Sequence, residues 1–241
     1  MVFRGSRCAV VAVIFSTSLA LHAQFPQIPG FGNRSTNGSA LDDTKIASGL
    51  KEALVVGTEK AVKLVARPGG YLDNEAIKIL LPQNLHPVEK ILRAAGEGPK
   101  IDEFIASMNH AAESAAPEAA SIFGDAVKEM TIDDARRLLN GGDTSITDYF
   151  KSKTSAQLAT AFRPHVVAAM NQNGVTQQYE ALVGQAPKLP FLNSSSLDIN
   201  TYVVNKALDG LFYMLGQQER EIRTNPAAWT TALLKQVFGH S

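Results

Sequence analysis

The feature that most constrains this chain is a helical spacing of apolar residues that runs from Leu41 almost to the C-terminus. Apolar side chains recur three or four positions apart, and Gly, Pro and Asn-Gly breaks separate the periodic segments. No similarity recurs at a period of about 30 to 45 residues, which argues against an α-solenoid. The spacing predicts an all-α fold over residues 41–239, a single compact array of about eight helices.

Local signals place several helix ends. Thr131 and Asp134 have the spacing of a capping box with Asp in place of Glu, and Asp198 is a candidate N-cap. Thr154 is a candidate N-cap for a further, long helix. A final helix is predicted over residues 226–238. The segment near residues 70–82 stays open, because "AIKILLP" alternates too briefly to separate one very short strand or hairpin from a turn of helix.

The N-terminus has the order of a secretory signal peptide. Arg4 and Arg7 precede an apolar run, and the small residue of "LHA" then places cleavage near Ala23. The run is about 14 residues long, shorter than the roughly 20 that cross a bilayer, so no stable membrane anchor is expected. Retention of the signal as an anchor is the alternative. We predict a signal peptide over residues 1–23, a flexible lead rich in Pro, Gly, Asn and Ser over 24–40, and a periplasmic or secreted protein.

Composition excludes several classes of function. The only cysteine, Cys8, lies in the predicted signal, so the mature chain is cysteine-free and lacks disulfides and thiolate metal sites. Lys plus Arg and Asp plus Glu each total 23, without a block of like charge, so nucleic acid is not an expected partner. The short sequence motifs that mark the large classes of enzymes and of nucleotide-binding proteins are absent. No two histidines have the i, i+4 spacing of a helical metal site. We therefore predict no metal and no cofactor.

Two predicted helices each carry a polar edge beside their apolar face. Asn109 and Glu113 form one edge, and Glu219 and Arg223 form the other. One hypothesis is a shared, partly buried polar seam in which Arg223 neutralises Glu113, Glu219 or both, because an unpaired buried carboxylate is costly. The simpler interpretation is that Glu219 pairs with Arg223 on its own helix while Asn109 and Glu113 bond neighbouring backbone. His110 is expected on the solvent side of its helix.

Three classes of function remain open. The first is a non-catalytic helical binding or interaction module whose partner is an unknown protein or small-molecule ligand. The second is a hydrolase or lyase that uses Glu113 or Glu219 as general acid or base, supported by Tyr149 or Arg223. The third is a structural or membrane-surface role through the apolar face of "AAWTTALLKQVF" in the final helix.

Several separated blocks resemble the bacterial DUF4197 family, a domain of unknown function. They are "GLKEAL", "GGYLDNEAIKILLP", "MNHAAESAAPEAASIF", "MTIDDARRLL" and "YVVNKALDGLFYMLGQQEREIRTNPAAWTTALLKQVFG", and they span roughly Leu41 to Gly239. The resemblance implies an exported helical bacterial domain. It implies no activity and assigns no functional residue. His110 and Trp229 stand where arginine is more usual in that family.

Overall fold

The computed structural model describes residues 37–172 and 198–225, with side chains from Thr44 onward. Apart from Asn37, these residues belong to one compact unit, Gly38–Ser241. The predicted signal peptide, most of the lead and the predicted final helix lie outside the described residues.

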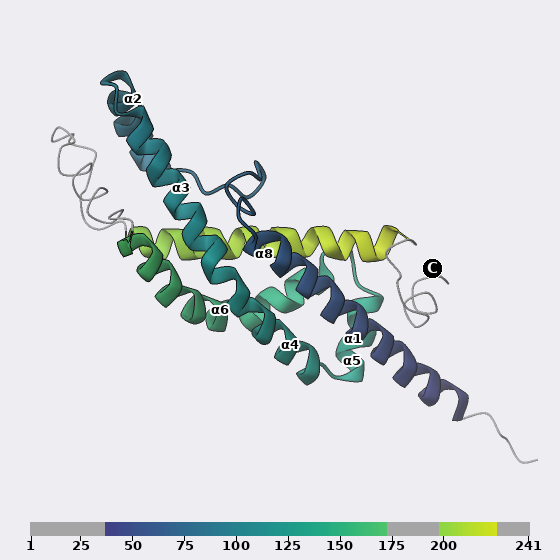
Figure 1. Ribbon diagram of the computed structural model, residues 1–241. Coiled ribbons are helices and arrows are strands. Elements are labelled where there is room, and N and C mark those ends of the chain that lie inside the picture. The colour runs from purple at the N-terminus through teal and green to yellow at the C-terminus, as the bar shows by residue number, and fades with distance from the viewer. Residues whose placement is uncertain (1–36, 173–197, 226–241) are drawn as a thin grey trace, which may run out of the picture. The chain divides into compact units, whose positions relative to one another are not determined.

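The described part of the chain is helical, with turns and short extended stretches between the helices (Figure 1). The all-α prediction is confirmed, although the helix count differs somewhat from the predicted array of about eight. In chain order the elements are α1 (Asn37–Ala66), η1 (Gln83–Leu85), α2 (His86–Ala94), α3 (Gly98–Ala115), η2 (Ala116–Glu118), α4 (Ala119–Glu129), α5 (Ile132–Leu139), α6 (Ser145–Gln172) and α8 (Ile199–Thr224).

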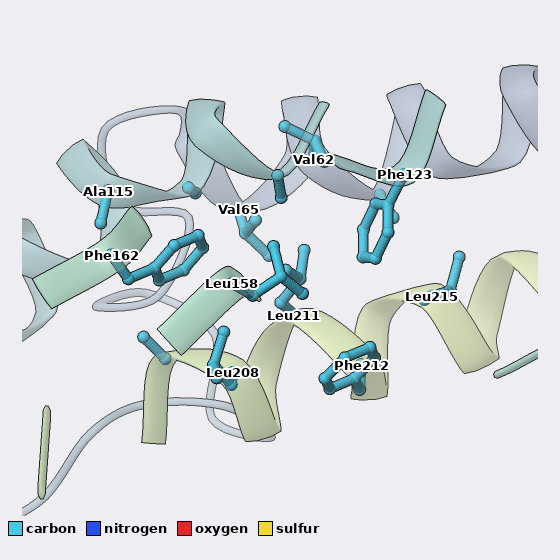
Figure 2. Close-up of a cluster of buried hydrophobic side chains, with 14 of the residues drawn as sticks. Val62, Val65, Ala115, Phe123, Leu158, Phe162, Leu208, Leu211, Phe212 and Leu215 are labelled. Atoms are coloured by element: carbon cyan, nitrogen blue, oxygen red, sulfur yellow. The ribbon is translucent and has the colours of Figure 1, made fainter. Parts of the chain in front are cut away.

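Three helices, α3, α6 and α8, form the centre of the packing. α6 packs against both α3 and α8, and α3 also packs against α8. Figure 2 shows Leu158 and Phe162 of α6 beside Leu211 of α8, and all three side chains are fully buried. Phe123 of α4 meets Phe150 of α6 edge to face with ring centroids 5.2 Å apart. Each such side chain contributes about 1.5 to 3 kcal/mol by leaving water, so this apolar contact is what holds the helices together.

One glycine of α8, Gly210, permits the close approach of another element, whereas a side chain at Gly216 would make only an ordinary contact. A Cβ on Gly210 would lie 2.6 Å from the Tyr71 ring, and one on Gly216 would lie 3.5 Å from Thr147 Oγ1. Gly210 therefore accommodates the connection between α1 and α2, and Gly216 faces the first turn of α6. Ala112 of α3 and Ala116, the first residue of η2, are both fully buried in the same core.

The predicted helix caps at Thr131 and Asp198 are confirmed. Thr131 Oγ1 accepts a hydrogen bond from the Asp134 N–H at 3.0 Å, and Asp134 Oδ2 accepts one from the Thr131 N–H at 3.1 Å. Asp198 Oδ1 accepts hydrogen bonds from the N–H groups of Asn200 and Thr201 at 3.0 and 3.2 Å. Both caps satisfy N–H groups that have no partner within their own helix.

The prediction that Thr154 caps a helix is wrong, because α6 begins at Ser145. Thr154 is buried inside α6, and its hydroxyl donates to the Phe150 carbonyl at 2.6 Å. A threonine in a helix interior can satisfy its hydroxyl in this way, four residues back. Pro164 also lies within α6.

The connection between α1 and α2 contains no strand. Residues 69–82, called the 69–82 segment below, form turns followed by an extended stretch from Lys78 to Pro82. Gly69 lies in the turn that follows α1 and has φ of +74°, a backbone conformation that favours glycine. The side chains of Tyr71, Ile77 and Ile79 are buried, so the segment is part of the core.

Candidate functional site

Asn109 on α3 fixes the extended stretch of the 69–82 segment. Its Oδ1 accepts a hydrogen bond from the Ile79 N–H at 2.8 Å, and its Nδ2 donates to the Ile79 carbonyl at 2.9 Å and to the Ile105 carbonyl at 2.7 Å. The Asn109 side-chain amide thus makes the two bonds that a neighbouring antiparallel strand would make to Ile79. Since Asn109 is 0% exposed, these bonds satisfy backbone groups that water does not reach.

Glu113, one turn further along α3, holds the beginning of the same segment. Its Oε1 accepts hydrogen bonds from the N–H groups of Tyr71 and Leu72 at 3.1 and 3.2 Å. Its Oε2 lies 2.9 Å from His110 Nδ1. Glu113 is buried, whereas the His110 side chain is 52% exposed. The carboxylate is therefore supplied with donors on both oxygens, as burial of such a group requires.

Tyr71 links the segment to α8. Its hydroxyl donates to the Ala207 carbonyl at 2.7 Å, and its ring is fully buried against Gly210. Burial, and secondarily the charge of Glu113, raises the pKa of the Tyr71 phenol far above its usual range. The phenol therefore stays protonated and acts as a hydrogen-bond donor.

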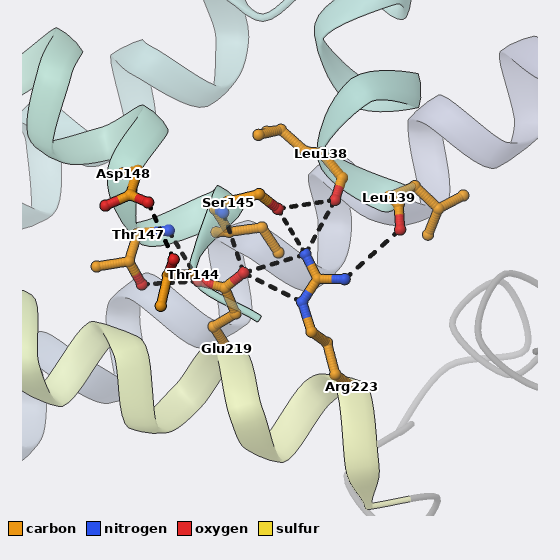
Figure 3. A network of polar contacts seen from close by, with 9 residues as sticks. Leu138, Leu139, Thr144, Ser145, Thr147, Asp148, Glu219 and Arg223 are labelled. Atoms are coloured by element: carbon orange, nitrogen blue, oxygen red, sulfur yellow. Dashed lines mark hydrogen bonds and ion pairs between the residues drawn. The ribbon is translucent and has the colours of Figure 1, made fainter. Parts of the chain in front are cut away.

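Glu219 on α8 caps the N-terminus of α6, as Figure 3 shows. Its Oε1 accepts a hydrogen bond from the Ile146 N–H at 3.0 Å. Its Oε2 accepts from the Thr147 N–H at 2.9 Å and from the Thr147 hydroxyl at 2.8 Å. Glu219 is only 1% exposed. A carboxylate at this position satisfies two free helix N–H groups and lies at the positive end of the helix dipole.

Arg223, one turn further along α8, joins Glu219 to the end of α5 (Figure 3). Its Nε and Nη2 lie 3.1 and 3.0 Å from Glu219 Oε1. Nη2 also donates to the Leu138 carbonyl at 2.9 Å and to the Ser145 hydroxyl at 2.8 Å, and Nη1 lies 3.5 Å from the Leu139 carbonyl. The guanidinium thus covers carbonyls at the C-terminus of α5 while Glu219 covers N–H groups at the start of α6.

The structure arranges the predicted polar residues in two networks. Asn109 and Glu113 share the 69–82 segment, and Glu219 and Arg223 share the α5–α6 junction. Among the described residues, no hydrogen bond or ion pair joins Glu113 to Arg223. The physical reason is that the polar edge of α3 lies against the chain after α1, whereas the polar edge of α8 lies against the start of α6.

Tyr149 belongs to neither network. It is partly buried, and its ring packs edge to face against Phe150 with centroids 5.7 Å apart. Lys153 Nζ lies 6.0 Å from the centre of the Tyr149 ring. Burial, with the nearby charges of Asp134 and Glu129, raises the pKa of the Tyr149 phenol.

Sequence reasoning missed several members of both networks. His110 contacts Glu113 although it lies on the solvent side of α3, and the i, i+3 spacing of the two residues is the signal that points to the contact. Tyr71 and Thr147 have no comparable signal, because each lies more than 40 positions from the glutamate that it contacts.

The described residues bring together no set of three or more His, Cys, Asp or Glu side chains suited to a metal ion. None of the described helices combines the length and the hydropathy of a membrane span. The predicted final helix, a candidate membrane contact, lies outside the described residues.

Comparison with known proteins gives a family. The model of the family described as "Protein of unknown function (DUF4197)" matches residues 40–239. No curated protein and no solved structure matches the chain.

Proposed function

Since the chain belongs to the DUF4197 family, for which no activity is described, we propose from the site geometry that it is a non-catalytic helical binding or interaction module. We place it in the periplasm or outside the cell, after signal cleavage near Ala23. The observation that carries the proposal is the role of Glu113 and Glu219. Both are buried, and both oxygens of each accept hydrogen bonds from the protein's own groups.

A general acid or base must reach the proton that it transfers in the bound substrate. Glu219 meets two backbone N–H groups, a hydroxyl and a guanidinium, and Glu113 meets two backbone N–H groups and an imidazole. Freeing either carboxylate would leave two backbone N–H groups without partners inside the protein, at a cost of about 1 to 3 kcal/mol for each. The geometry therefore supports a structural role for both glutamates.

One contact favours the alternative, a hydrolase or lyase. Glu113 Oε2 lies 2.9 Å from His110 Nδ1, and His110 is half-exposed. A carboxylate that orients an imidazole in this way leaves the second ring nitrogen available as a base. The sequence predicts Glu113 or Glu219 as the general acid or base of such an enzyme, whereas this contact favours His110 as the base, with Glu113 orienting its ring.

Site-specific photocrosslinking in the native host tests the proposal. A photoreactive amino acid is placed at Ile91 on α2 or Ile132 on α5, two large apolar side chains that are exposed, and at exposed Gln157 on α6 as a control. We expect one defined crosslinked partner from an apolar position and none from Gln157. Crosslinking at all three positions alike, or at none, contradicts an interaction module.

Hydrolysis assays with a panel of ester and amide substrates distinguish the hydrolase alternative from the interaction module. We expect the purified chain and Glu113→Gln to show the same background rate, while urea unfolding checks that the variant is folded. Turnover that Glu113→Gln and His110→Ala both abolish, in folded protein, would establish the hydrolase instead. Host-purified protein that begins at Met1 rather than near Gln24 would contradict cleavage of the signal near Ala23.

A further inference from the structure

The outward face of α8 carries a strip of four residues, Tyr202, Lys206, Asp209 and Tyr213, called the α8 strip below. At 100° per residue these positions fall within a sector of about 60°, opposite the buried face that contains Leu211. Lys206 and Asp209 are exposed, Tyr213 is 46% exposed, and Tyr202 is partly exposed. Lys206, Asp209 and Tyr213 therefore form an exposed surface, with Tyr202 at its edge packed partly against the core.

The α8 strip has the spacing of a helix–helix contact. Its members are separated by four, three and four residues, which is the heptad spacing that places side chains along one line of contact between two helices. Two of the four are tyrosines, a residue type enriched in protein interfaces because its ring is large and rigid. Beside Tyr202, whose hydroxyl donates to the Leu80 carbonyl at 2.9 Å, the Leu80 side chain is 53% exposed.

The order of residues in the strip is self-complementary. Tyr202 and Tyr213 lie equally far from the point midway between Ala207 and Leu208. Lys206 and Asp209 lie equally far from the same point. A two-fold axis through that point brings each tyrosine onto the other tyrosine of a second copy, and each lysine onto an aspartate. A parallel pairing would instead place Lys206 on Lys206.

We propose that the chain forms a two-fold symmetric dimer through antiparallel pairing of two α8 strips. The occupant of this face is a second copy, because the charges and the aromatic positions of the strip complement themselves under a two-fold rotation. Within one copy Lys206 Nζ already lies 3.3 Å from Asp209 Oδ2, so both charged groups are present at the centre of the contact. The inference does not depend on the proposed function.

The size of the strip sets the strength of the dimer. Its residues span about 16 Å of helix, which is short for an interface, so the contact belongs to the weak, concentration-dependent class. Self-association should therefore rise from micromolar to millimolar protein, and it should weaken with added salt because two Lys–Asp contacts lie at its centre.

Sedimentation equilibrium of the mature chain, Gln24–Ser241, with two charge variants tests the pairing. Lys206→Glu places acid against Asp209 of the second copy, and Asp209→Lys places base against Lys206. Each variant alone should self-associate at least about tenfold more weakly than wild type, because like charges then face each other twice in the dimer. A mixture of the two variants should regain association, since every contact then joins opposite charges.

Lys63→Glu on α1 is the matched control, because Lys63 is also exposed and also lies beside an acidic residue of its own helix, Glu59. It should leave the association constant unchanged. Circular dichroism of each variant checks that α8 is intact. A wild-type chain that stays monomeric at millimolar concentration overturns the proposal. So does a dimer that both charge variants retain, or a mixture that associates no better than its components.

Discussion

At the residue scale, Asn109 shows how one side chain can replace an element of secondary structure. Its amide satisfies both the N–H and the carbonyl of Ile79, so an extended stretch remains buried without a neighbouring strand. An aspartate at this position would lack the Nδ2 donor and would place a carboxylate oxygen against two carbonyls, so the amide is required chemically.

Replacing Asn109 by alanine should therefore be costly. The change leaves the N–H and carbonyl of Ile79 without partners in the core, and we expect a loss of about 3 kcal/mol in the free energy of unfolding. Urea unfolding measures the loss, with Gln157→Ala on the exposed face of α6 as the control. A loss for Asn109→Ala no larger than for the control would show that the 69–82 segment does not depend on this amide.

At the element scale, the ends of α5 and α6 are satisfied in different ways. α5 begins with a local capping box, in which Thr131 and Asp134 are three residues apart. α6 begins where Glu219, from α8, meets the N–H groups of Ile146 and Thr147. The first arrangement depends on neighbours in the chain, and the second depends on the tertiary fold.

The capping box should make the stability of α5 depend on pH. Hydrogen bonds from the Thr131 hydroxyl and N–H, with a contribution from Arg137, hold the pKa of Asp134 below its usual value of 3.8. A carboxyl whose pKa is lower in the folded chain stabilises the fold above the unfolded pKa, and this contribution is lost as the pH falls through the folded pKa.

We therefore expect Asp134→Asn to lower the urea midpoint near neutral pH and to have a smaller effect below pH 3.8. Asp143→Asn, at an exposed position in the α5–α6 connection, controls for the general loss of one negative charge. A difference between wild type and Asp134→Asn that stays constant across this pH range would contradict the role assigned to the carboxylate.

The same contrast explains how much of the structure could be predicted. The apolar period predicts α1 to α6 and α8, and short spacings predict the caps at Thr131 and Asp198, because the interacting residues are neighbours in the chain. The sequence predicts a helix start at Thr154 instead of Ser145, because the cap of α6 comes from Glu219, 73 positions from Ile146. The contacts of Glu113 with Tyr71 and Leu72 cannot be predicted from local spacing, because they also join residues that are distant in the chain.

At the scale of the whole molecule, the two networks join segments that are distant in the chain. Glu113 and Asn109 join α3 to the connection after α1, and the Tyr71 hydroxyl bonds that connection to α8. Glu219 and Arg223 join α8 to both ends of the α5–α6 junction. Each carboxylate therefore fixes the path of the backbone, and the two act separately and in structural roles.

Two double-mutant cycles in urea test that claim most directly. Arg223→Met removes the cation that neutralises buried Glu219, so we expect the free energy of unfolding to fall by about 3 to 5 kcal/mol. Adding Glu219→Gln should recover part of that loss, because the uncompensated charge is then gone, whereas adding Glu113→Gln should give the sum of the two single losses to within about 0.5 kcal/mol. Coupling of Arg223 to Glu113 as strong as its coupling to Glu219 would contradict the account and would favour one shared polar site.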